Sequence, residues 1–93
     1  MDRITVRVVI RGRVQGVGYR WWACTQARQL KIGGWIRNRR DGSVELLASG
    51  AATAVDYLLE ACRRGPASAA VTSLERFEAP DEDFSGFEER PTI

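Results

Sequence analysis

Three glycines lie within seven residues near the N-terminus, and an arginine follows two residues after the last of them. The segment is Gly12-Arg13-Val14-Gln15-Gly16-Val17-Gly18, and Arg20 follows at the start of a predicted helix. Glycine permits the positive φ angles that turn successive backbone N–H groups toward one point, and a helix N-terminus adds to their positive field. The guanidinium of Arg20 can fold over an anion bound by these N–H groups. The pattern predicts an anion-binding loop; the alternative is a tight strand-to-helix turn that only requires glycine.

Asn38 is the second candidate for chemistry. An asparagine amide can donate and accept hydrogen bonds at the same time, so it could orient a water molecule. The alternative interpretation is an ordinary turn residue, because Arg39-Arg40-Asp41-Gly42 follows directly. The chain has no histidine and two cysteines, which argues against a standard zinc site and leaves no Ser-His or Cys-His nucleophile pair. We therefore expect no metal and no cofactor.

The cysteine and tryptophan side chains give no further candidate for catalysis. Cys62 falls on the apolar stripe of the second predicted helix and Cys24 falls off the stripe of the first, so no disulfide between them is expected. The Trp21-Trp22 pair is compatible with base stacking, but Trp22 lies on the helix stripe and is explained more simply as core. Trp35 is predicted to lie exposed on the sheet.

The charges are divided unevenly along the chain. Residues 1–40 hold ten of the fourteen cations and one of the twelve anions, although the whole chain carries a net charge of only +2. A concentration of arginine favours an anionic ligand, either a phosphate or a nucleic acid. The alternative is that the two parts of the chain attract each other across the fold.

Those candidates depend on a short series of elements. A first strand is predicted at residues 3–11, because one set of apolar side chains recurs at every second position, as on a strand with one buried face. That set is Ile4, Val6, Val8 and Ile10, and it alternates with Arg3, Thr5, Arg7 and Arg11. A helix is predicted from residue 19 to residue 31. Its inward stripe is Tyr19, Trp22, Ala23, Ala27 and Leu30.

The second part of the chain repeats that order. Residues 35–38 and 43–48 are predicted strands, joined by a hairpin turn at Arg40-Asp41-Gly42. Ser49-Gly50 is expected to cap a helix over residues 51–64, which Gly65-Pro66 ends. A strand over residues 69–78 requires a bulge for Val71 and Leu74 to share a face, and residues 84–89 form a short last strand. The inward stripe of the second helix is Val55, Leu58, Leu59 and Cys62.

The order strand, helix, strand, strand, helix, strand predicts an α+β fold. It is the ferredoxin-like split βαβ sandwich, a mixed sheet with both helices on one face. A right-handed crossover makes the first two strands parallel, with the third inserted between them. Their C-terminal ends then share one rim of the sheet, so the glycine loop and Asn38 are expected about 9–10 Å apart. An arginine from one end and an asparagine from the other could enclose a phosphate and a water.

Two segments give the sequence a family resemblance. Residues 12–20, GRVQGVGYR, resemble the signature G-x-V-Q-G-V-x-F-R of the acylphosphatase family, and residues 34–45, GWIRNRRDGSVE, resemble its second signature, G-W-V-x-N-x-x-D-G-x-V-E. The likeness covers about residues 4–90. Tyr19 replaces the usual phenylalanine and adds a hydroxyl that needs a partner if it is buried. Lys31 stands where many members end the helix with glycine, so that end is expected to be strained or to shift to Gly33.

The resemblance implies hydrolysis of acyl phosphates to a carboxylate and inorganic phosphate, without metal or cofactor. It assigns phosphate binding to Arg20 and to the backbone amides of the loop, and it assigns orientation of the attacking water to Asn38. The loop residues are Val14, Gln15, Gly16, Val17, Gly18 and Tyr19. The implied partners are a small acyl phosphate as substrate and phosphate as product and inhibitor.

Two alternatives remain at this stage. An RNA-binding module of the same fold would carry aromatic side chains on its central strands, whereas residues 43–48 read Ser-Val-Glu-Leu-Leu-Ala. The other is a carbamoyl-phosphate-handling domain, since similar domains begin larger hydrogenase-maturation proteins. We expect a single domain over residues 1–93, monomeric and cytoplasmic, that binds neither nucleic acid nor membrane.

Overall fold

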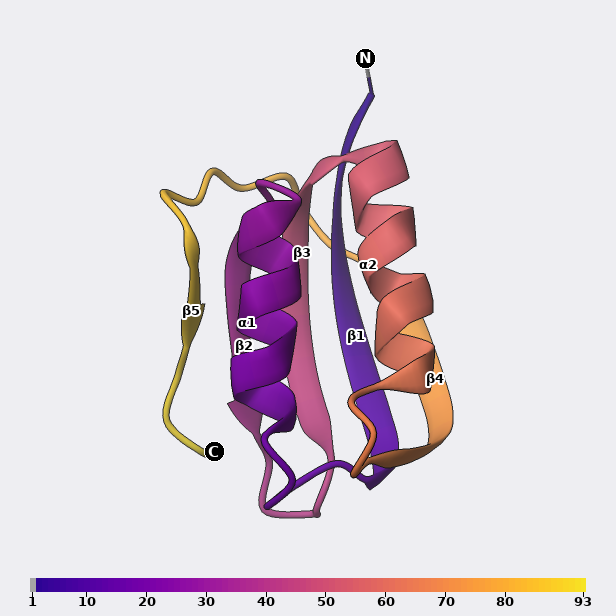
Figure 1. Ribbon diagram of the computed structural model, residues 1–93. Coiled ribbons are helices and arrows are strands. Elements are labelled where there is room, and N and C mark those ends of the chain that lie inside the picture. Colours follow the sequence, from indigo (N-terminus) through magenta and orange to yellow (C-terminus); the bar gives the residue numbers. More distant parts are fainter. Residues whose placement is uncertain (1) are drawn as a thin grey trace.

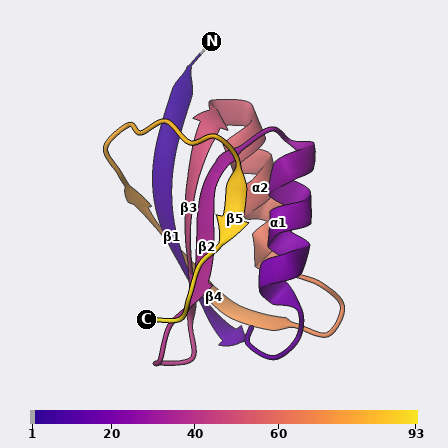
Figure 2. The ribbon, with the colours of Figure 1, turned by 90° about the vertical axis from the view of Figure 1, so that its left-hand side faces the viewer.

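A five-stranded sheet covered on one face by two helices makes up the structure, a computed structural model that describes residues 2–93 (Figure 1). In Figure 2 both helices lie on the same side of the sheet. The predicted ferredoxin-like α+β fold is therefore confirmed. The elements are β1 (Arg3–Arg13), α1 (Tyr19–Gln29), β2 (Gly33–Asn38), β3 (Val44–Ala51), α2 (Ala52–Arg64), β4 (Ala70–Glu78) and β5 (Phe87–Glu89).

The strand order β4-β1-β3-β2-β5 decides which loops meet. β3 pairs antiparallel with both β1 and β2, so β1 and β2 run parallel with β3 between them, as predicted. β5 pairs parallel with β2. Because parallel strands end at the same edge of a sheet, the β1–α1 loop, the end of β2 and the end of β5 gather at one end of the molecule (lower end of Figure 1).

The predicted bulge in β4 is present. The register against β1 shifts between Arg11, opposite Ser73, and Gly12, opposite Val71. Gly12 has φ 121°, and a Cβ there would lie 2.2 Å from the carbonyl oxygen of Ala70. Only glycine therefore fits this close approach of β1 to β4.

The core lies between the helices and the sheet. The predicted stripe of α2 is buried in full, and the phenolic O–H of Tyr19 donates a hydrogen bond of 2.7 Å to the carbonyl oxygen of Cys62. The tyrosine hydroxyl thus has the partner that its burial requires. Burial also raises the pKa of the Cys62 thiol to about 11. Cys24 and Cys62 are both free thiols, as predicted.

The predicted stripe of α1 was partly wrong. Cys24 is 1% exposed and belongs to the core, whereas Trp22 is only partly buried. α1 lies over β5 as well as β2, so the fifth strand widens the surface that the helix covers. That extra contact buries the side of α1 that carries Cys24.

Two further predictions were wrong. Trp35 is 8% exposed rather than open, because the guanidinium groups of Arg37 and Arg90 lie 4.6 and 5.1 Å from its ring centroid. Ser49 does not cap α2: it lies in β3, and its hydroxyl pairs with that of Thr5 at 2.8 Å. The helix begins without a side-chain cap after Ala51.

None of the helices in residues 2–93 is long and apolar enough to cross a membrane.

Ion pairs join the two oppositely charged parts of the chain. Cations from residues 1–40 meet anions from residues 41–93 on several strands and loops, so attraction across the fold accounts for much of the charge division. The pairs are Arg3 with Asp81 and Asp83, Arg7 and Arg37 with Glu45, Arg11 with Asp41 and Glu75, Arg20 with Glu89, and Arg39 with Asp41.

Lys31 ends α1 in a left-handed conformation, with φ 57°. Its N–H donates to the carbonyl of Arg28 at 3.1 Å, and the N–H of Ile32 donates to that of Ala27 at 2.9 Å. This is the Schellman arrangement that usually places glycine at the left-handed position. The strained end expected from the sequence is therefore present, and it lies at Lys31 rather than Gly33.

Replacing Lys31 with glycine should stabilise the protein. A left-handed residue with a Cβ costs roughly 1–2 kcal/mol, part of which the greater freedom of glycine in the unfolded chain offsets. We expect Lys31→Gly to raise the free energy of unfolding by about 0.5–1 kcal/mol in urea denaturation. Lys31→Ala is the control, because it removes the side chain and keeps the strain. Equal stabilisation by both variants would show that the backbone conformation is not the cause.

Glu45 binds two arginines on the sheet face away from the helices. Its carboxylate accepts hydrogen bonds of 3.0 Å from Arg7 on β1 and 2.8 Å from Arg37 on β2. Burial raises the pKa of Glu45, but the hydrogen bonds and charges of the two guanidiniums outweigh it and leave the pKa below its ordinary value of 4.5. The ionised carboxylate therefore ties three strands together.

This depressed pKa predicts a pH-dependent contribution of Glu45. Its stabilisation is present above the unfolded-state pKa of about 4.5 and is lost as pH falls through the lower folded-state pKa. Glu45→Gln should cost about 1–2 kcal/mol at pH 7, and in thermal unfolding its difference in stability from wild type should shrink as the pH falls below 4.5. Asp56→Asn, which removes the exposed pair with Arg76, should cost much less. A Glu45→Gln difference that does not change with pH would contradict this account.

Candidate active site

A cavity of about 190 Å³ lies at the end of the sheet where β1, β2 and β5 finish. It brings Arg20, from the first turn of α1, together with Asn38, the last residue of β2. The topology thus places both sequence-predicted side chains in one site. The lining residues are Val14, Gly16, Gly18, Tyr19, Arg20, Trp21, Asn38 and Glu89.

The glycine loop supplies backbone donors to this cavity. Gly16 and Gly18 have φ angles of 72° and 78°, and a Cβ at either would meet no atom within 4 Å. Glycine is therefore favoured there by the backbone angle rather than by lack of space. Gly18 is the N-cap of α1, which has no side-chain cap and no acidic residue in its first turn. Its first N–H groups consequently lack intrahelical acceptors and carry the positive end of the helix dipole.

Gln15 holds the loop against the β2–β3 hairpin. Its amide nitrogen donates to the carbonyl oxygens of Arg39 at 2.7 Å and Ser43 at 2.8 Å. These residues flank the turn that follows Asn38. The side chain of Gln15 therefore fixes the distance between the loop and Asn38.

Val17 has a structural role on the other side of the loop. Its side chain packs partly against the core, and its carbonyl oxygen accepts a hydrogen bond of 3.0 Å from the Ser68 hydroxyl. Of the loop residues that the sequence suggested, Gln15 and Val17 are absent from the cavity lining, whereas Val14, Gly16, Gly18 and Tyr19 form part of it.

The hairpin beyond Asn38 is rigidly hydrogen-bonded. The carboxylate of Asp41 accepts hydrogen bonds from the hydroxyl and the backbone N–H of Ser43. These bonds, followed by the nearby charges of Arg39 and Arg11, lower the pKa of Asp41 to about 2. Asp41 is thus ionised at neutral pH and keeps the turn in one conformation.

The side chain of Asn38 carries an unusual polar atom. Its Oδ1 is buried and has no hydrogen-bond partner among residues 2–93, while its backbone carbonyl accepts from the N–H of Ile93 at 3.2 Å. Leaving a buried acceptor unpaired costs about 1–3 kcal/mol. The strand and the C-terminal segment therefore hold the residue in place, and its amide oxygen is left without a donor.

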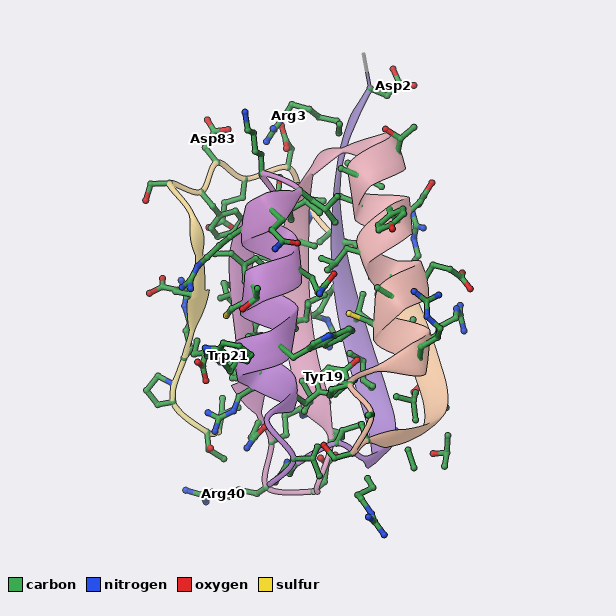
Figure 3. All side chains as sticks on the ribbon, viewed as in Figure 1. Asp2, Arg3, Tyr19, Trp21, Arg40 and Asp83 are labelled. Carbon is green, nitrogen blue, oxygen red and sulfur yellow. The ribbon has the colours of Figure 1, made fainter. Side chains whose placement is uncertain are left out.

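Two lining residues were not found by sequence reasoning. Glu89, the last residue of β5, lies 3.8 Å from Nε of Arg20 through Oε1. Trp21 projects from the first turn of α1 (Figure 3) and is 67% exposed. A parallel pairing of residues 87–89 with β2 would have placed Glu89 at the same rim, but nothing in the local sequence specifies that pairing. From the sequence alone, Trp21 is a candidate only for base stacking.

The site offers no cluster of metal ligands. Within residues 2–93, no group of three or more His, Cys, Asp or Glu side chains could hold a metal ion. Its chemistry is therefore that of backbone N–H groups, one guanidinium, one carboxylate and one amide. The structure is thus a split βαβ sandwich with one arginine and one helix N-terminus at the same rim of its sheet.

Comparison with known proteins identifies the family. The Acylphosphatase family model matches residues 6–89. The acylphosphatase of Acidiphilium cryptum is 50% identical over 90 residues, which cover 96% of this chain and 98% of the relative. The crystal structure of the Bacillus subtilis acylphosphatase has 35% identity and a TM-score of 0.91, covering 94% of this chain and 98% of that one. The chain belongs to the acylphosphatase family.

The same fold also occurs inside a larger protein. The crystal structure of T. kodakarensis HypF has a TM-score of 0.83 and 23% identity, and the match covers 99% of this chain but 12% of that one. At this identity the likeness concerns the fold alone.

The bridge made by Gln15 predicts a loss of turnover. Gln15→Ala removes two hydrogen bonds, but Arg39 and Ser43 keep backbone partners for their carbonyl oxygens, so about 1–2 kcal/mol of stability should be lost. A loop displaced by about 1 Å should lower kcat for benzoyl phosphate by roughly 100-fold. Ser68→Ala, which removes the loop contact away from the hairpin, is the matched control. Equal losses of kcat in the two variants would contradict a specific role of Gln15.

Proposed function

We propose that the loop and Arg20 hold the phosphoryl group of an acyl phosphate while Asn38 positions the attacking water. The reaction is that of the family, hydrolysis to a carboxylate and inorganic phosphate. The observation that carries the proposal is the buried, unpartnered Oδ1 of Asn38 in the same cavity as Arg20. A water can donate to that oxygen, and a phosphoryl oxygen can accept from the guanidinium.

Phosphate binding in this proposal rests on fixed dipoles and one charge. The free N–H groups at the start of α1 and the Arg20 guanidinium address the anion together. Arg20 is in a long ion pair with Glu89, at 3.8 Å, and its side chain is 35% exposed. Such a pair contributes little to stability, so a dianionic phosphoryl group can compete with the carboxylate for the guanidinium.

The chemistry needs few groups. The leaving carboxylate has a conjugate acid with a pKa of about 4, so it departs without a general acid. The water loses a proton as its oxygen bonds to phosphorus and the P–O bond to the carboxylate breaks; a phosphoryl oxygen of the substrate accepts that proton. Catalysis then consists of positioning and electrostatic stabilisation. No histidine is required.

The RNA-binding alternative fits the structure less well. The sheet face on which RNA-binding modules stack bases carries the Arg7–Glu45–Arg37 cluster, and Trp35 there is covered by guanidiniums. A filter-binding titration against salt would test RNA binding directly.

We further propose that the enzyme acts as a cytoplasmic monomer on a small substrate. The two free thiols support a reducing compartment.

Arg20 and Asn38 should respond differently to substitution. Arg20→Gln removes a charge-assisted contact made in the ground and transition states, so it should weaken competitive inhibition by phosphate and lower kcat. Asn38→Ala should lower kcat for benzoyl phosphate by roughly 100-fold and leave the phosphate inhibition constant nearly unchanged. It should not unfold the protein, because an unpaired buried oxygen is removed.

Three measurements on wild type and both variants decide these roles: kcat, the phosphate inhibition constant and the melting temperature, with EDTA in the assay. Equal weakening of phosphate binding by the two substitutions would make Asn38 a phosphate ligand. Full activity of folded Asn38→Ala would show that another group holds the water. Complete loss of wild-type activity in EDTA, restored by a divalent ion, would refute the metal-independent mechanism.

A further inference from the structure

We infer that Trp21 forms the binding surface for the acyl group, and that the site favours flat, uncharged aromatic acyl phosphates over small aliphatic ones. This inference rests on the proposed function, since it names the substrate class of that site. Trp21 follows Arg20 directly and lines the same cavity. Figure 3 shows the indole projecting from the beginning of α1, away from the side on which Tyr19 lies.

The cavity of about 190 Å³ has an inner wall and a rim. Its inner wall includes Val14 and Tyr19, each 1% exposed, whereas Trp21 is 67% exposed. The exposures mark Trp21 as part of the rim. An acyl group that extends from a phosphoryl group in the cavity toward solvent therefore passes over Trp21.

The geometry of phosphoryl transfer points to the same wall. The attacking water and the leaving carboxylate lie roughly in line on opposite sides of phosphorus. Asn38 belongs to the strand wall of the cavity, whereas Trp21 belongs to the helix wall. If Asn38 holds the water at the strand wall, the acyl group must lie on the opposite side of phosphorus, at the helix wall.

Trp21 differs from the other exposed aromatic residues. Phe77 is stacked under the guanidinium of Arg7 at 4.6 Å, and Tyr57 lies on α2, away from the cavity lining. The aromatic and cation–π contacts found within residues 2–93 do not include Trp21. Its indole face is thus available to a ligand ring, which would gain both apolar burial and ring stacking.

Glu89 narrows the class of acyl group. Its carboxylate lies at the same rim, with its side chain 42% exposed. Arg20 offsets this charge where the phosphoryl group binds, but an acyl group with a further carboxylate would meet Glu89 without a second cation in the lining. Uncharged acyl groups are therefore favoured.

The test compares benzoyl phosphate with acetyl phosphate in wild type, Trp21→Ala, Trp21→Phe and the control Tyr57→Ala. Trp21→Ala should lower kcat/KM for benzoyl phosphate about threefold to tenfold, the usual value of an aromatic pair. The loss for acetyl phosphate should be smaller, because a methyl group covers less of the indole than a phenyl ring does, so the benzoyl-to-acetyl ratio of kcat/KM should fall. Trp21→Phe should keep most of the wild-type ratio of kcat/KM for benzoyl phosphate to kcat/KM for acetyl phosphate. Tyr57→Ala should match wild type with both substrates.

The outcomes separate this inference from the proposed function. Equal losses for both substrates, or an unchanged preference in Trp21→Ala, would overturn the acyl-binding role of Trp21 while the hydrolysis stands. Hydrolysis of neither substrate by wild type would overturn the proposed function. In that case calorimetric titration with benzylphosphonate still decides the inference: Trp21→Ala must weaken its binding threefold or more, and equal affinities would overturn it.

Discussion

The site depends on one amide that joins two segments far apart in sequence. Gln15 donates to both sides of the β2–β3 turn, at 2.7 and 2.8 Å, and thereby sets the loop that carries the backbone donors against the strand end that carries Asn38. The topology alone brings these segments to one rim, because β3 lies between two parallel strands. Strand spacing gives their approximate separation, and the amide gives the closer adjustment that the proposed positioning of a water requires.

The charge distribution follows from the same architecture. The cations of the first forty residues meet the anions of the later ones mostly through exposed pairs, which stabilise weakly. Glu45 is different, because its carboxylate is nearly buried between Arg7 and Arg37 and removal of one partner would leave a charge uncompensated. Arg20 is different in another way. Its Nε lies 3.8 Å from the carboxylate of Glu89. This contact orients the guanidinium but leaves its other N–H donors available.

Much of this could be predicted because the signals were local. Alternation marked β1, glycine spacing marked the loop, and the two signatures around Arg20 and Asn38 indicated the family. The errors arose where a distant segment decided the environment. Trp35 alternates like an exposed residue but is covered by Arg90 from beyond β5, and Cys24 is buried because α1 also lies over β5. Glu89 entered the site through that same strand, which has three residues and too short a pattern to reveal its partner.

Asn38 shows how stability and activity are divided in this fold. A buried amide oxygen without a partner opposes folding by about 1–3 kcal/mol, and removing it would relieve that cost. Its backbone is nevertheless fixed by pairing with Val44 and by the N–H of Ile93, and the core beneath is held independently by the hydrogen bond from Tyr19 to Cys62. In the proposed mechanism this acceptor meets a water, so the strand that carries Asn38, rather than a titrating side chain, supplies the positioning.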